Sequence, residues 1–204
     1  MKEKEVQAIK SKEKIKLIAL EEFANKGYKM ASTNVICKKA NISKGLLYHY
    51  YSSKEELYLD IIRSIIDTFK ENVTLKNNDT NKKGIDYVSE YFNIKFKFFR
   101  DNPLYSKLIT GLLLCDDVDG IRRFIEEFEN HNNSIIYKIL ESISINPKFD
   151  KGKAFELIVM VGDKLEEKYL KHIQNTDEDK NEILEKFREE HKLMIQMIFE
   201  GIDQ

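Results

Sequence analysis

The sequence predicts an all-α fold of about nine helices, and three observations support this prediction. The 204 residues include only 8 glycines and 2 prolines, the residues that most often interrupt helices. Apolar side chains recur at spacings of three and four residues, and no segment shows the alternation of a β-strand. Charged residues make up 34% and hydrophobic residues 42% of the chain, as expected of a globular protein with solvated helix faces.

A first helix is predicted before Gly27. Its apolar stripe consists of Ile15, Ile18, Ala19 and Phe23, while lysines and glutamates fill the other faces. Glycine readily takes the backbone conformation that follows a helix, so Gly27 is expected to end it.

Two short helices joined by a tight turn are predicted next. Ser32 can cap the first, which has about eight residues, and Ser43 can cap the second, which runs to Tyr50 or Tyr51. The turn lies at Asn41-Ile42. A compact pair of this kind can place its second helix in a DNA major groove about 12 Å wide. The apolar residues expected to set the crossing angle are Ile36, Ala40, Ile42 and Leu47.

Six longer helices complete the prediction. Ser52-Ser53 can cap a long fourth helix, whose apolar positions are Leu57, Ile61, Ile65 and Phe69. The others are expected at about 84–100, 103–115, 119–144, 148–174 and 177–201. The breaks between them are expected at Asn77 to Gly84, Asp101-Asn102-Pro103, Cys115 to Gly120, Asn146-Pro147 and Asn175-Thr176-Asp177.

Charge is distributed unevenly along the chain. Residues 1–56 contain 12 Lys and 7 Glu, a net charge of +5, so the remainder carries −6. A nucleic-acid-binding module attached to a non-binding domain would show this asymmetry. Charge alone does not separate that interpretation from chance patterning in a lysine-rich chain.

The segment from Ser32 to Lys54 carries chemistry suited to DNA. Ser32 and Ser43 place hydroxyl groups at helix N-termini, where phosphates bind well. Gly45 lets the backbone come close to DNA. The side chains that can donate hydrogen bonds to phosphates or base edges are Lys44, Tyr48, His49 and Lys54.

The same region resembles the TetR family of bacterial regulators over about residues 12–60. The resemblance rests on Phe23, Gly27-Tyr28, Ser32, Ile36, Ala40-Asn41-Ile42-Ser43-Lys44-Gly45, Leu47-Tyr48-His49-Tyr50-Tyr51 and Ser53-Lys54-Glu55-Glu56-Leu57. It implies a homodimer of nine or ten helices per chain, with a DNA-binding N-terminus and an effector pocket in a divergent C-terminal domain. On this basis we expect a helix-turn-helix DNA-binding domain at residues 1–56 and an effector-binding and dimerisation domain at residues 57–204.

The resemblance also implies roles for single residues. The residues that match phosphate contacts are Ser32, Tyr48 and Lys54. The residues that match groove-facing base readers are Asn34, Lys44, Leu46 and His49.

Three positions depart from the family pattern. Leu46 replaces a small or hydroxylated residue, so an apolar contact to a thymine methyl group is expected there. Asn41 replaces the turn glycine, which is acceptable because asparagine tolerates the left-handed region. Tyr51 replaces phenylalanine and is expected in the core.

The last two predicted helices are amphipathic over their whole length. Their apolar positions are Phe155, Ile158, Val159, Gly162, Leu165, Tyr169 and Ile173, then Ile183, Leu184, Phe187, Met194, Ile195, Ile198 and Phe199. Stripes this broad suggest a second partner, and the resemblance implies a four-helix interface between two copies, where Gly162 would allow close approach. Burial entirely within one subunit is the alternative.

Aromatic residues are frequent between residues 85 and 140, and such residues form core more often than pocket. A cavity for a small apolar effector would need polar groups that converge on the apolar wall. The candidates with suitable chemistry are Tyr87, Tyr91, Asn93 and Tyr137.

The main functional hypothesis is a repressor that leaves a palindromic operator when a small molecule binds. A DNA-binding dimer controlled by a protein partner, without an effector, is the alternative. A helical enzyme or scaffold with a vestigial helix-turn-helix is a third. The four histidines show no metal-ligand spacing and no phosphate-binding glycine loop is present, so no catalytic residue, metal or cofactor is predicted.

The location expected from the sequence is the cytoplasm. Met1 to Glu5 is not followed by an apolar run, and no stretch approaches eighteen consecutive apolar residues. Cys37 and Cys115 have no paired spacing, so both are expected to be buried or half-buried thiols.

Overall fold

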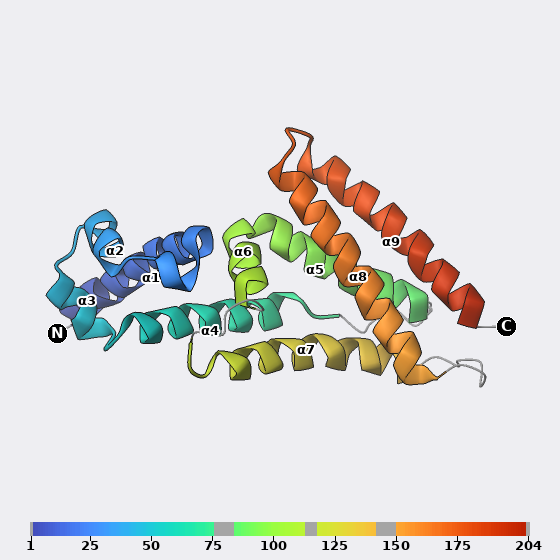
Figure 1. Ribbon diagram of the computed structural model, residues 1–204, viewed down its shortest axis with the longest axis horizontal. Helices are drawn as coiled ribbons and strands as arrows, with labels where there is room; N and C mark the ends of the chain where they lie inside the picture. The colour runs from blue at the N-terminus through green and yellow to red at the C-terminus, as the bar shows by residue number, and fades with distance from the viewer. Residues whose placement is uncertain (1, 76–83, 113–117, 142–149, 203–204) are drawn as a thin grey trace. The chain divides into compact units, whose positions relative to one another are not determined.

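The computed structural model describes residues 2–75, 84–112, 118–141 and 150–202, with side chains from Ser11 to Glu200 within these ranges. Helices are the only regular elements there, which confirms the all-α prediction (Figure 1). They are α1 (Lys2–Met30), α2 (Thr33–Ala40), α3 (Lys44–Tyr50), α4 (Lys54–Asn72), α5 (Gly84–Asp101), α6 (Pro103–Leu112), α7 (Ile121–Glu141), α8 (Lys151–Gln174) and α9 (Lys180–Ile202).

The first compact unit consists of residues 1–68 and 102–128. In this unit α1 packs against α2 and α6, and α2 packs against α3. The ring of Phe23 on α1 meets that of Tyr58 on α4 edge-on, with centroids 4.9 Å apart. Other buried apolar side chains of this unit are Ile15, Ala19, Ile36, Leu47 and Tyr51. They hold the short helices α2 and α3 in place.

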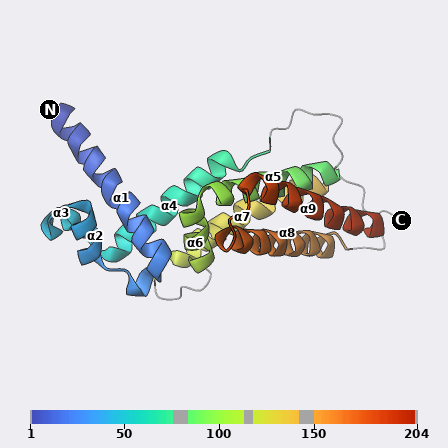
Figure 2. The same cartoon turned by 90° about the horizontal axis from the view of Figure 1, so that it is seen from above.

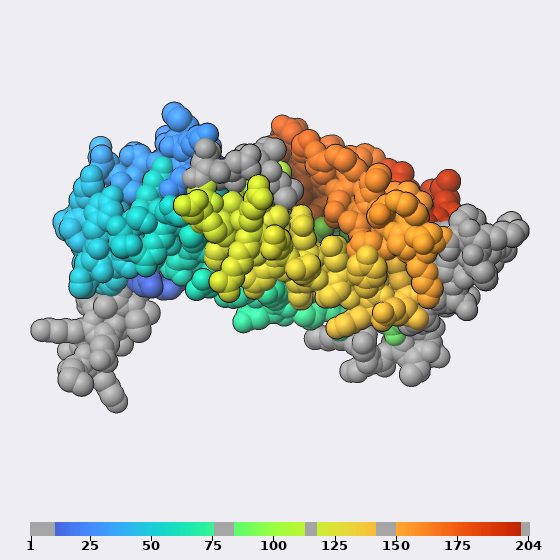
Figure 3. All heavy atoms as spheres, turned by 60° about the horizontal axis from the view of Figure 1, so that its bottom comes forward, coloured from blue at the N-terminus to red at the C-terminus, as the bar shows by residue number. Residues whose placement is uncertain are grey.

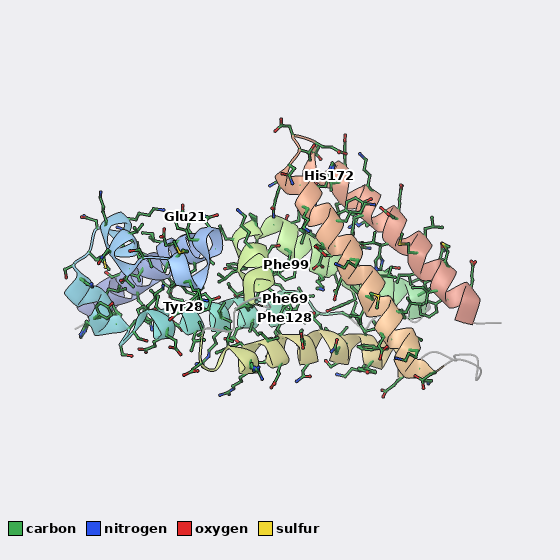
Figure 4. All side chains as sticks on the ribbon, in the orientation of Figure 1. Glu21, Tyr28, Phe69, Phe99, Phe128 and His172 are labelled. Carbon is green, nitrogen blue, oxygen red and sulfur yellow. The ribbon has the colours of Figure 1, made fainter. Side chains whose placement is uncertain are left out.

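The second compact unit consists of residues 69–101 and 129–204. Here α5 packs against α8 and α9, and these two helices lie side by side (Figure 2). Phe96 of α5 stacks on Phe187 of α9 with ring centroids 4.1 Å apart. Phe69 and Phe99 lie next to each other, with centroids 5.5 Å apart (Figure 4). The core of this unit is therefore strongly aromatic.

Gly162 allows a close approach between α5 and α8. A Cβ atom on this residue would lie 2.1 Å from the ring of Phe92, far inside van der Waals contact. The sequence had suggested that Gly162 serves a contact between copies. In the structure Gly162 serves a contact between α5 and α8 of one chain, and its part in a contact between copies stays a prediction.

The backbone of α1 breaks at Gly27. This residue has φ 71° and ψ 165°, a combination that is essentially restricted to glycine. One further turn follows, and the Ala31 N–H donates to the Gly27 carbonyl at 3.1 Å. The prediction that the regular helix ends at Gly27 is therefore correct. The additional helical turn from Gly27 to Met30 was not predicted.

Some sequence predictions fall on segments that the structure does not describe. These are most of the break from Asn77 to Gly84, the segment from Cys115 to residue 117, and the break at Asn146-Pro147.

Cys37 is buried on α2, and burial raises the pKa of its thiol. In the described ranges, none of the helices has the length and apolar character needed to cross a membrane.

Candidate nucleic-acid interface

The turn between α2 and α3 is formed by a residue in the left-handed region. Asn41 has φ 55° and ψ 50°, and its N–H donates to the carbonyls of Cys37 and Lys38 at the end of α2. Asparagine populates this region more readily than other residues with a side chain. The replacement of a turn glycine by Asn41 is thereby explained, and α3 leaves the turn in a defined direction.

Helix α3 has one buried face and one exposed face. Leu47 is buried, and the following Tyr51 is 2% exposed and donates to Asp60 Oδ2 at 3.0 Å. Burial, helped by Asp60, raises the pKa of Tyr51. The prediction that Tyr51 belongs to the core is correct, and it fixes the rotation of α3.

The exposed face of α3 carries four of the predicted contact residues. Lys44, Gly45, Tyr48 and His49 fall on this face at helical spacing, and all four are exposed. The Lys44 ammonium lies 5.9 Å from the centroid of the Tyr48 ring, so these two side chains share one surface. A cation and hydrogen-bond donors are therefore available together on this face, as binding to a phosphate backbone requires.

The N-terminus of α3 is capped by its own serine. Ser43 Oγ accepts a hydrogen bond from the Leu46 N–H at 3.1 Å, as the sequence predicted for an N-cap. Leu46 is half-buried and lies in the chain between the exposed Gly45 and the buried Leu47.

The N-terminus of α2 is arranged differently. The side chain of Ser32 makes no capping hydrogen bond, although its backbone conformation is that of an N-cap. Its N–H donates to Glu22 Oε1 at 3.4 Å, and Glu22 is 3% exposed. The Ser32 hydroxyl is thus not committed to its own helix, and Asn34 is exposed on the same first turn.

Glu22 was missed by sequence reasoning. Its position lies between Ile18 and Phe23 on the apolar stripe of α1, where a carboxylate is unexpected. Charged residues are almost never fully buried unless they are paired, so a glutamate in that stripe was the available signal. Lys26 pairs with it at 3.8 Å.

Lys54 connects the end of α1 with the start of α4. Its ammonium donates to the Lys29 carbonyl at 3.3 Å and lies 4.6 Å from the centroid of the Tyr28 ring. Partial burial lowers the pKa of Lys54. Figure 4 shows Tyr28 beside α4. The sequence predicted only a phosphate contact for this residue, whereas the structure gives it an internal contact as well.

A second capping arrangement begins α4. Ser53 Oγ accepts from the Glu56 N–H at 3.0 Å, and the Glu56 carboxylate accepts from the Ser52 N–H at 2.6 Å. The Ser52 hydroxyl also donates to this carboxylate, and the hydrogen bonds from the hydroxyl and the N–H of Ser52 lower the pKa of Glu56. Ser53 therefore caps the N-terminus of α4, and Lys54 lies in the first turn of this helix.

The four residues proposed from the sequence for an effector pocket all lie in the second unit. Tyr91 is buried and donates to Asn132 of α7, and burial raises its pKa. Asn93 Oδ1 is buried without a hydrogen-bond partner among the described residues. Tyr137 is 48% exposed and stacks on Phe155 at 3.9 Å. Tyr87 is half-buried on α5.

Comparison with known proteins connects this geometry to a family. Residues 18–61 match the family of bacterial regulatory proteins described as the tetR family. The negative transcriptional regulator IcaR of the biofilm operon icaADBC, from Staphylococcus epidermidis, is 32% identical over 152 residues, which cover 73% of this chain and 78% of IcaR. The transcriptional regulator RutR from Escherichia coli K12 is 30% identical over 132 residues, which span only 61% of each chain.

A solved structure supports the similarity of fold. The transcriptional regulator FadR from Bacillus subtilis, in complex with stearoyl-CoA, matches with a TM-score of 0.68. The match covers 93% of this chain and 98% of that chain at 19% identity. At this level of identity the likeness concerns the fold.

Proposed function

The chain belongs to the TetR family of bacterial regulators, and from this premise we propose that it is a DNA-binding transcriptional repressor that acts as a homodimer. The observation that carries the proposal is the exposed face of α3, on which Lys44, Gly45, Tyr48 and His49 lie together. IcaR, the relative with the more extensive match, is named as a negative regulator. The DNA-binding domain is residues 1–56, and the effector-binding and dimerisation domain is residues 57–204.

The proposed contacts fall into two groups. Ser32, Tyr48 and Lys54 bind phosphates, with Ser43 and Gly45 bringing the backbone of α3 close to the DNA. Lys44, Leu46 and His49, with Asn34 on α2, read base edges in the major groove. The free hydroxyl of Ser32 and the exposure of Tyr48 support the first group. The position of Lys44 and His49 on the exposed face supports the second.

Dimerisation through α8 and α9 is supported by apolar side chains that remain exposed on both helices. Each helix buries one apolar stripe within the chain and presents a second one outward. The exposed residues are Leu157 and Met160 on α8, and Leu193, Met194 and Met197 on α9. Large apolar side chains that remain exposed in this number on two neighbouring helices are typical of an interface. Two copies joined here would present two α3 helices to successive major grooves of a palindromic operator.

Release from the operator follows from an effector bound in the second unit. The effector must bind more tightly to the conformation that fits DNA poorly, because only such a difference shifts the population. FadR, which has a similar fold, is described in complex with stearoyl-CoA, so this fold can hold a ligand. In this chain, the buried polar side chains of Tyr91 and Asn93 on α5 support a ligand site in the second unit.

Salt-dependent DNA binding tests the proposal. The purified chain should select fragments of genomic DNA, and its affinity should fall steeply with salt, with a slope of roughly 0.9 per phosphate contact. Tyr48→Ala should weaken binding to all sequences alike, whereas His49→Ala should change the preferred sequence. Lys97→Ala is the control, because Lys97 is exposed on α5 in the second unit and has no proposed role in DNA or effector binding. A folded dimer without DNA affinity at low salt would refute the proposal.

A further inference from the structure

Buried polar side chains gather on one face of α5 in the second unit. Tyr91 and Lys95 are one turn apart on this face. Tyr91 donates to Asn132 of α7, while the Lys95 ammonium donates to Asp163 Oδ1 of α8 at 2.7 Å and lies 3.5 Å from Glu166 Oε1. The cluster therefore joins α5 to α7 on one side and to α8 on the other.

One carboxylate oxygen of this cluster lacks a partner. Glu166 is 8% exposed, and its Oε2 atom is buried without a hydrogen bond to any residue that the structure describes. Burial raises the pKa of Glu166 to about 7, although Lys95 acts in the opposite direction. A buried polar atom without a partner costs free energy, so such an atom is a sign that a further hydrogen-bond donor belongs there.

The charges of the cluster indicate what kind of donor is missing. Lys95 supplies one positive charge, while Asp163 and an ionised Glu166 supply two negative charges. One ammonium therefore serves two carboxylates, and the cluster has a net charge of −1. An added cation would cancel this charge and donate to the free oxygen, whereas an added anion would be repelled by both carboxylates.

The surroundings limit the size of the added group. The Phe92 ring lies against Gly162 with no space for even a Cβ atom, so the α5–α8 contact beside the cluster is closed. Asp163 is half exposed, which opens the cluster toward solvent. Figure 3 shows a recess between α7 and α8, with green atoms of α5 at its floor. A compact group can reach the cluster from the solvent side at Asp163.

We propose that Asp163 and Glu166, held in place by Lys95, bind a compact cationic nitrogen group, a primary ammonium or guanidinium, carried by the effector of this protein. The inference deepens the proposed function and rests on it in naming the ligand as the effector. The ammonium donates to Glu166 Oε2 and to Asp163, and it restores electrical neutrality to the cluster. This chemistry differs from the small apolar effector expected from the sequence.

Calorimetric titration with molecules of one size and different charge tests the site. The full chain is titrated at pH 8 with n-butylammonium, n-butanol and butyrate, at an ionic strength held constant with KCl. The expected result is saturable binding of n-butylammonium at one molecule per chain, with weaker or no binding of the other two. Equal binding of n-butylammonium and n-butanol, or preference for butyrate, would overturn the proposal.

Variants with unchanged shape separate the cluster from other acidic positions. Glu166→Gln should weaken n-butylammonium binding by roughly ten- to a hundredfold, since a hydrogen bond to a charged group is lost. Asp163→Asn should also weaken n-butylammonium binding, and it is a second test at a half-exposed position. Glu167→Gln is the control, because the Glu167 carboxylate accepts hydrogen bonds from Lys164 and Lys171 on α8, and its ion pairs in the described structure do not include Lys95. Unchanged binding in both Glu166→Gln and Asp163→Asn would exclude the site.

Measurement of DNA affinity distinguishes failure of this inference from failure of the proposed function. Saturable n-butylammonium binding that depends on Glu166 supports the site, whatever the DNA result. A chain that binds n-butylammonium but no DNA refutes the proposed repressor and leaves the site intact. A chain that binds DNA but does not distinguish n-butylammonium from n-butanol refutes the site and leaves the repressor intact.

Discussion

At the scale of single residues, three glycines show how one residue type serves different purposes. Gly27 adopts a backbone conformation that side chains disfavour, although a Cβ atom there would meet nothing within 4 Å. Gly162 would clash with Phe92. Gly45 needs neither explanation, because a Cβ atom would contact only Ser43 Oγ at an ordinary 3.8 Å and its φ lies in the common range. Folding therefore does not require glycine at position 45.

The substitutions Gly27→Ala and Gly45→Ala should have opposite consequences. Gly27→Ala should lower the free energy of unfolding by roughly 1–3 kcal/mol, because alanine is strained at this φ and ψ. Gly45→Ala should leave the free energy of unfolding unchanged or raise it by up to about 1 kcal/mol, because alanine favours helices. It should nevertheless weaken DNA binding if the α3 backbone touches DNA. Urea unfolding and DNA titration measure the two effects, and full DNA affinity in Gly45→Ala would contradict the proposed close approach.

Glu166 predicts a pH dependence of stability. Its pKa is raised by burial from 4.5 to about 7, so the folded chain holds a proton that the unfolded chain releases between these values. Its contribution to stability is therefore greatest below pH 4.5, falls as the pH rises to about 7, and stays constant above. Glu166→Gln should remove this fall, so the variant should gain stability relative to the parent across that range.

The matched control for the pH experiment is Glu167→Gln. Hydrogen bonds from Lys164 and Lys171 lower the pKa of Glu167 to about 2, so its contribution is lost only as the pH falls below 4.5. Chemical unfolding at several pH values should therefore show no difference in slope between this variant and the parent from pH 4.5 to 7. The same slope in Glu166→Gln as in the parent would show that Glu166 is already ionised in that range.

The fate of individual tyrosines and lysines was only partly predictable from sequence. The distinction between a core Tyr51 and an exposed Tyr48 followed from the resemblance to the family pattern. The contact of Lys54 with the Lys29 carbonyl could not be predicted in this way, because the two residues are 25 positions apart on different helices. Spacing reports which residues share a helix face, but not which distant backbone atom lies opposite that face.

At the scale of elements, the helix-turn-helix was predicted closely because local signals define it. Ser43, Asn41 and the Ser53–Glu56 pair act through hydrogen bonds to residues within four positions. The Glu166 cluster was not predicted, because its three helices are separated by long stretches of chain. Sequence reasoning named Tyr91 from that cluster but missed Lys95, Asp163 and Glu166, which resembled solvated positions of amphipathic helices.

The two serines that begin α2 and α3 allow a test of element stability against DNA contact. Ser43→Ala removes the hydrogen bond from the Leu46 N–H and should lower the free energy of unfolding by about 1 kcal/mol. Ser32→Ala removes no capping bond, so it should change stability by less than about 0.5 kcal/mol. If the Ser32 hydroxyl binds a phosphate, this variant should bind DNA roughly tenfold more weakly. Parental DNA affinity in Ser32→Ala would remove Ser32 from the proposed interface.

At the scale of the whole molecule, the positive charge of the chain and the proposed DNA contacts lie in the same N-terminal part. The net charge of +5 falls on residues 1–56, which include the proposed DNA contacts, and the remaining residues are acidic. The second unit has an aromatic core, while exposed methionines and leucines lie on the outer faces of α8 and α9. The sequence could predict that these two helices are apolar over a wide angle. It could not predict which of these positions are buried within the chain and which remain exposed.

The exposed apolar face of α8 and α9 predicts that charge placed there will separate the dimer. Met160 on α8 and Met197 on α9 are 62% and 66% exposed, so neither is needed to fold the single chain. The double variant Met160→Lys, Met197→Lys should fold with a helical content like that of the parent but sediment as a monomer, because burying unpaired ammonium groups in an apolar interface is strongly unfavourable. Leu17→Lys on α1 is the control, since Leu17 is equally exposed at 65% and lies outside these helices.

A monomeric variant should also bind a palindromic site with affinity close to that for a half-site, because the second α3 is no longer joined to the first. Persistence of the dimer in the double variant would place the interface elsewhere on the molecule.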